Sequence, residues 1–179
     1  MSNKHKPRRP RWARTGDTFG LALHYAQKIS PEEISHIMAP MLEAFAAMRT
    51  ATASEQQWAQ IDHSISLAQT IEAQGVVRGL SAHLAAAKQA SLAIYQRAMQ
   101  DHADACTPAG QWQPTALYFG EIEALQTHTE LHEFQLQHLS RGELRKAVDK
   151  TISRVQSTSA SASATIVVHN PCAQAALCF

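Results

Sequence analysis

The stretch Trp112–Leu139, WQPTALYFGEIEALQTHTELHEFQLQHL, decides the fold that this chain is expected to have. Mostly apolar side chains, interrupted by the polar Thr129 and His132, recur in it at alternating steps of three and four residues, which places them on one face of an α-helix. That face comprises Ile122, Leu125, Thr129, His132, Leu136 and Leu139. Pro114 followed by Thr115 is typical of a helix start. The pattern therefore predicts a long helix inside a bundle, with Gln135 and the glutamates on its flanks and wet side.

Helical patterns also cover most of the remaining chain. Capping-box signatures begin at Ser30, Ser54 and Ser140, each followed three residues later by Glu or Gln. Pro40 lies inside the first of the helices they open and predicts a kink or a break near Ala39. Further helical runs are expected at residues 18–29, from Leu80 to Met99, and from Arg141 to about Val155. Asp101 to Gly110 is predicted to be a loop.

Composition supports the same fold class. The chain has 179 residues, 45% apolar and only 6% aromatic, and alanine is abundant. Alanine and leucine favour helices, and few segments alternate as half-buried strands do. We therefore expect an all-α bundle of about five helices in residues 17–156. A basic, disordered arm is expected at residues 1–16 and a flexible Ser/Ala-rich tail at 157–179.

The compartment is predicted from what the sequence lacks. No apolar run approaches the roughly 18–20 residues that span a membrane, and no apolar segment follows the charged N-terminus as in a secretory signal. The three cysteines, an odd number, do not describe a disulfide framework. A cytoplasmic protein without a membrane partner is the expectation.

Charge is distributed unevenly along the chain. Residues 1–14 contain six basic side chains and no acidic one, whereas the other residues carry ten basic against 15 acidic. Such an arm can follow a phosphate backbone, with a tryptophan available to stack on a base. The candidate nucleic-acid contacts in it are Lys4, Lys6, Arg8, Arg9, Arg11, Trp12 and Arg14. A solvated cationic tail is the open alternative.

The junction of the last two helices is a second candidate for DNA or RNA binding. Residues 134–148 have the rhythm of a helix-turn-helix, and the final helix is basic. Its candidate contacts are Arg141, Arg145 and Lys146. His138 stands where the turn usually has glycine, and Phe134 stands where a small residue would let the helices close. An ordinary helical corner is therefore the favoured interpretation.

The histidines of the central stretch suggest a metal site, because His128 and His132 are one helical turn apart. A zinc-protease motif begins at His132, but position 136 is leucine where the second histidine belongs. We therefore predict buried, hydrogen-bonded or surface histidines and no metal. Cys106 lies close to His102 in sequence, which is weak support for a catalytic pair. No catalytic residue and no cofactor is predicted.

Three motifs carry a resemblance to a known group of proteins. The segments at 112–118, 132–136 and 139–143 resemble those of small uncharacterised helical proteins of proteobacterial prophages and mobile elements. The resemblance extends over about residues 31–156. Some of those proteins are loosely labelled Fis-type transcriptional regulators, but no full Fis-type motif is present here. The resemblance implies a bacterial or phage accessory protein and supplies no catalytic residues.

Two functional hypotheses follow from these observations. The first is a non-enzymatic accessory protein that acts as a nucleic-acid-associated regulator through its basic arm. The alternative is a helical protein–protein interaction module, either a modulator of a host protein or a homo-oligomeric scaffold. An exposed apolar patch on the folded body, away from the arm, would favour the alternative.

Overall fold

The computed structural model describes residues 15–100 and 111–165 of the chain, and side chains within 18–100 and 111–157. These residues form helices and no strands, so the all-α prediction is confirmed. The elements are α1 (Thr15–Ala26), α2 (Pro31–Arg49), α3 (Glu55–Gln74), α4 (Ser81–Met99), α5 (Phe119–His138) and α6 (Arg141–Thr165). The predicted loop at 101–110 lies outside the described residues.

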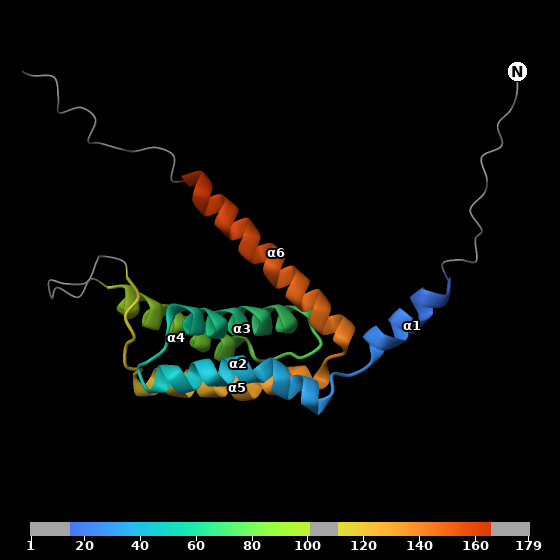
Figure 1. Ribbon diagram of the computed structural model, residues 1–179, viewed down its shortest axis with the longest axis horizontal. Coiled ribbons are helices and arrows are strands. Elements are labelled where there is room, and N and C mark those ends of the chain that lie inside the picture. Colours follow the sequence, from blue (N-terminus) through green and yellow to red (C-terminus); the bar gives the residue numbers. More distant parts are fainter. Residues whose placement is uncertain (1–14, 101–110, 166–179) are drawn as a thin grey trace, which may run out of the picture.

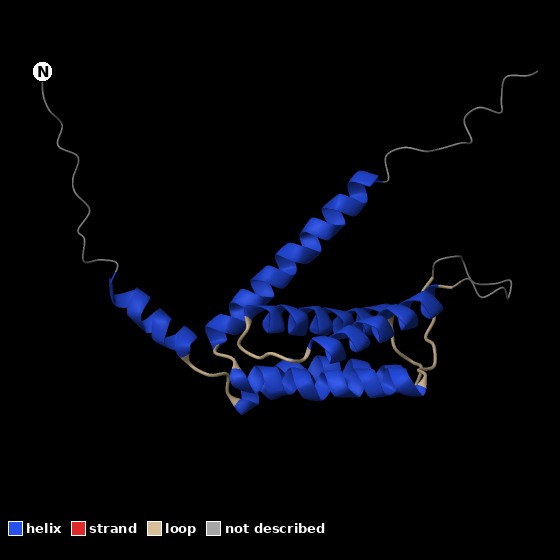
Figure 2. Cartoon of the chain, turned by 180° about the vertical axis from the view of Figure 1, so that it is seen from behind, coloured by secondary structure: helices blue, strands red, loops and turns tan. Residues whose placement is uncertain are grey.

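Helices α2 to α5 form a four-helix bundle. α2 packs on α3 and α5, and α4 packs on α3 and α5, which closes the ring. α6 packs along α3 and then rises away from the bundle, while α1 contacts α6 and projects in another direction from the same end (Figure 1). The view from behind in Figure 2 shows the same divergence. The bundle thus holds most of the core, and two helices extend from it.

The predicted caps of the helices are confirmed. The hydroxyls of Ser30 and Ser54 accept hydrogen bonds from the amides of Glu33 and Gln57, and the side chains of those two residues accept from the serine amides. At Ser140, the amide donates to Glu143 Oε2 over 2.8 Å. Each box satisfies amides that a helix start otherwise leaves without partners.

Helix α5 begins at Phe119, so the predicted start near Pro114 is wrong. The preceding residues run as a loop that is fastened to the bundle, because Trp112 Nε1 donates to the carbonyl of Ala53 over 2.8 Å. The cap is supplied by Glu121, whose Oε2 accepts from the amide of Tyr118 over 2.9 Å. The tertiary anchor of Trp112 outweighs the local start signal.

The inward face of α5 is richer in polar groups than expected. Leu125, His132 and Leu136 are buried as predicted, but Gln135 is fully buried as well, which corrects its expected place on the wet side. Gln135 can be buried because its amide nitrogen donates to the carbonyl of Ala68 over 3.1 Å. That bond joins α5 to α3.

Of the kink or break predicted near Ala39, the break is wrong, because α2 runs without a break through Pro40. The carbonyl that loses its partner there belongs to His36, which is exposed, so water can satisfy it. α6 continues past Val155 to Thr165, into the Ser/Ala-rich segment. Alanine has the highest helix propensity, which favours this extension.

We expect Ile94→Ala in α4 to lower the free energy of unfolding by about 2–5 kcal/mol, because Ile94 is 1% exposed and its removal leaves a cavity. Leu92→Ala in the same helix is the matched control. Leu92 is 45% exposed, so a change within about 0.5 kcal/mol is expected. Urea unfolding followed by circular dichroism measures both. Equal losses would contradict the described packing of α4.

Candidate functional site

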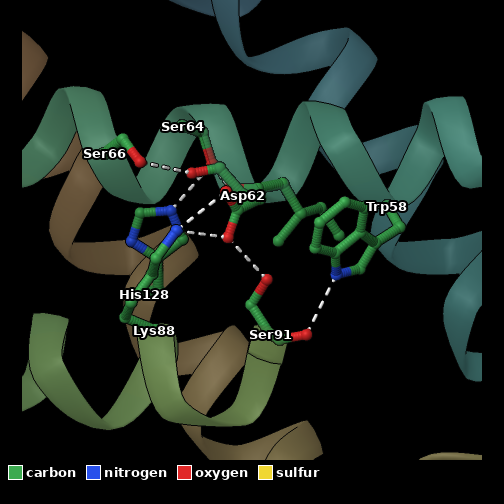
Figure 3. Close-up of polar contacts among 8 residues, drawn as sticks. Trp58, Asp62, Ser64, Ser66, Lys88, Ser91 and His128 are labelled. Atoms are coloured by element: carbon green, nitrogen blue, oxygen red, sulfur yellow. Dashed lines mark hydrogen bonds and ion pairs between the residues drawn. The ribbon is translucent and has the colours of Figure 1, made fainter. Parts of the chain in front are cut away.

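A partly buried polar network joins α3 to α4 (Figure 3). Lys88 Nζ lies 2.6 Å from Asp62 Oδ1 and 2.8 Å from Oδ2. The hydroxyl of Ser91 donates to the same carboxylate over 2.8 Å, and Trp58 Nε1 donates to the carbonyl of Ser91 over 3.0 Å. Both oxygens of the Asp62 carboxylate therefore have partners within the network. This fits a role in holding α3 against α4.

Ser64 and His128 form the nearest approach to a nucleophile–base pair. Ser64 Oγ lies 2.9 Å from His128 Nε2 and donates to the carbonyl of Ile61 over 2.7 Å. Because the hydroxyl proton is used on Ile61, His128 Nε2 is the donor to Ser64, the reverse of what activates a serine. His128 Nδ1 is buried without a hydrogen-bond partner, so no carboxylate orients the ring. The pair fits helix packing and not nucleophilic activation.

His128 and His132 stack on each other inside the bundle, with ring centroids 5.6 Å apart. Burial, and to a smaller extent the charge of His132, lowers the pKa of His128 to about 3. Burial also lowers the pKa of His132 to about 4, against a hydrogen bond with Gln135 that raises it. Among the described residues, no three His, Cys, Asp or Glu side chains are placed to hold a metal ion.

The candidate nucleic-acid contacts fall into two groups. The following lie outside the described residues: Lys4, Lys6, Arg8, Arg9, Arg11, Trp12 and Arg14. The other three lie on the first turns of α6. Lys146 is exposed, and Arg145 is exposed with its Nε 4.0 Å from Asp149 Oδ2. Both are thus available to a ligand from solvent.

The Arg141 side chain makes contacts with other residues of the chain. Its Nη2 lies 2.9 Å from Glu33 Oε1, and its Nη1 donates to Gln27 Oε1 over 2.6 Å. Nη1 also lies 3.2 Å from His24 Nδ1. The guanidinium therefore joins α6 to α2 and to the end of α1, a structural role that the sequence did not indicate.

An open groove lies between α2 and α6, beside Arg141. Its volume is about 670 Å³. The apolar lining consists of Ile29, Ile37, Leu144 and Val148, and the charged rim consists of Glu32, Glu33, Arg141, Arg145 and Asp149, with His36 beside them. We call this surface the α2–α6 groove. Its volume lies within the roughly 300–1,000 Å³ that is usual for protein binding pockets.

Helix α1 carries an uncovered apolar stripe. Phe19 and Leu23 are 70% and 53% exposed, and Ala22 and Ala26, on the same face, are also exposed. No function was predicted for Phe19, Leu23 or Ile37 from the sequence. Their spacing was visible in the sequence, but their exposure depends on where α1 and α6 leave the bundle.

Comparison with protein-family models, with curated proteins and with solved structures gives no match for this chain. Within residues 15–100 and 111–165, no helix combines the length and the apolar character needed to cross a membrane.

We expect the stability of the protein to fall as pH drops below about 6.5. The folded chain keeps His128 and His132 neutral, whereas the unfolded chain binds protons on them near their ordinary pKa of 6.5. Above pH 6.5 the two histidines therefore cost the folded state nothing. Between pH 6.5 and about pH 4, each histidine lowers the free energy of unfolding by up to about 1.4 kcal/mol per pH unit. Urea unfolding across this range measures the slope.

Two variants assign the slope to the buried pair. His128→Leu should reduce it, because one proton uptake on unfolding is removed. His36→Gln, a change at an exposed position on α2, should leave it unaltered. A slope that His128→Leu does not change would show that other groups cause the pH dependence.

Proposed function

We propose that this chain is a helical protein–protein interaction module, a non-enzymatic accessory protein of the cytoplasm and of phage or mobile-element origin. Its binding surfaces are the apolar stripe of α1 and the α2–α6 groove. The observation that carries the proposal is the stripe, because Phe19 is 70% exposed on a helix that extends from the bundle. Apolar side chains gathered on a projecting helix mark interaction sites.

The energetics of α1 support a partner. α1 has 12 residues, a length at which an isolated helix is marginally stable in water. Burying a phenylalanine or leucine side chain contributes about 1.5–3 kcal/mol. A partner that covers Phe19 and Leu23 would therefore stabilise α1 and gain binding energy from the same contact.

Nucleic-acid-associated regulation is the second candidate function. The observation that favours it is the exposed basic side of α6, where Arg145, Lys146 and Lys150 face solvent. Six basic residues in the N-terminal arm would add to the phosphate contacts. The acidic excess of the remaining chain opposes such binding outside these two segments.

The interaction function can be tested by photocrosslinking. We expect a chain with photoreactive benzoylphenylalanine in place of Phe19 to give discrete protein adducts in bacterial cells that express it, because the stripe is covered in the complex. The same replacement at Gln89 is the control. Gln89 is exposed on α4, which packs on α3 and α5. Adduct yields at position 19 no higher than at position 89 would contradict the proposal.

The nucleic-acid function can be tested by deleting residues 2–14. Retention of DNA or RNA on filters at low salt should then be abolished, because the phosphate contacts of the arm are lost. Arg145→Glu with Lys146→Glu should weaken retention to a smaller extent. If the truncated chain retains nucleic acid as well as the full chain does, the arm has no such role.

A further inference from the structure

We propose that α1 of one copy of this chain docks in the α2–α6 groove of a second copy, and that the second copy returns the same contact. This inference rests on the proposed interaction function and names its partner. The two chains would form a two-fold symmetric dimer in which the contact between α1 and the groove is made twice. Such a contact is isologous, because each copy contributes the same two surfaces.

The junction between α1 and α2 directs α1 away from the groove of its own chain. The amide of Arg141 donates to the carbonyl of Gln27 over 2.9 Å, and the amide of Ile29 donates to that of Leu139 over 3.4 Å. Lys28 Nζ also bonds the carbonyl of His138. These bonds hold residues 27–29 against the start of α6, next to the groove. A fold-back of α1 into its own groove would have to reverse the chain at this bonded segment.

The side of α1 that carries the stripe also faces away from its own α6. The contact with α6 is made by Tyr25, which packs so closely on Gly142 that a Cβ added there would meet Tyr25 Cβ at 3.1 Å. At 3.6 residues per turn, Phe19 and Leu23 point roughly 120° and 160° away from Tyr25 around the helix axis. The stripe is therefore open to another molecule while Tyr25 keeps α1 on its own chain.

The two surfaces have matching spacing. Phe19 and Leu23 are four residues apart, and so are Leu144 and Val148 in the groove. Ridges of side chains four residues apart interdigitate in the commonest mode of helix packing. The groove volume of about 670 Å³ leaves room for side chains of this kind between Ile37 and α6.

Charge favours a second copy as the occupant. The groove rim carries three carboxylates, Glu32, Glu33 and Asp149, against two guanidiniums. Outside residues 1–14 the chain has ten basic and 15 acidic residues, whereas the segment preceding α1 has six basic residues and no acid. The segment that precedes α1 in sequence is basic and the rest of the chain has an acidic excess, so the charges of two copies are complementary. Because the contact is made twice, each needs only half of the roughly 1,200–2,000 Å² of a stable interface.

Disulfide trapping tests which residues meet. In a chain with Cys106, Cys172 and Cys178 replaced by serine, single variants Phe19→Cys and Ile37→Cys are made with different tags and mixed under mild oxidation. We expect the mixed disulfide to exceed the amount that random pairing gives, because residue 19 of one copy lies against residue 37 of the other. Leu92→Cys replaces Ile37→Cys in the control. Random proportions, or a dominant disulfide between two copies of Phe19→Cys, would overturn the proposal.

Sedimentation equilibrium of the unmodified chain tests the dimer itself. We expect twice the chain mass of 19.6 kDa. Phe19→Asp and Ile37→Asp should each raise the dissociation constant at least about tenfold, and Leu92→Asp, at a leucine that is 45% exposed on α4, should not change it. A monomer at about 0.1 mM would overturn the proposed dimer. If position 19 nevertheless crosslinks to another protein, the interaction function stands and only the self-association fails.

Discussion

The contact of Arg141 with Glu33 joins the parts of the structure on which the proposed interaction function depends. It joins the first residue of α6 to the first turn of α2, and the same guanidinium bonds Gln27 at the end of α1. Glu33 also accepts from the amide of Ser30, and that bond, with the one from Arg141, lowers the pKa of its carboxyl. One carboxylate therefore caps α2 and orients α6. The junction lies beside the α2–α6 groove and next to the end of α1.

The sequence predicts what neighbouring residues determine. The three capping boxes at Ser30, Ser54 and Ser140 are each set within one helical turn, and they occur as predicted. The start of α5 could not be predicted in this way, because it depends on Trp112 reaching Ala53 across the bundle. The candidate site shows the same limit. Arg141 was assigned to phosphate by its charge, but its partner Glu33 is 108 residues away.

The buried polar side chains of α5 fix the position of this helix against α3, although their residue types first suggested a metal site. His128 bonds Ser64 and Gln135 bonds the carbonyl of Ala68, so both tie α5 to α3 at fixed positions along the helices. An apolar face would permit α5 to slide by a turn with little loss of packing, whereas a one-turn shift would leave these polar groups buried without partners. Their bonds therefore select one register, and the low pKa values of the histidines are a consequence of that burial.

Contacts within a single chain do not explain why the apolar stripe of α1 is exposed. The buried core comes from α2 to α6 and the segments that join them, so Phe19 and Leu23 contribute little to its stability. A helix of 12 residues gains little from propensity alone, and exposed phenylalanine and leucine side chains favour association. Both properties are explained if α1 is completed by a surface outside its own chain. The α2–α6 groove, which starts where α1 leaves the bundle, presents such a surface on every copy.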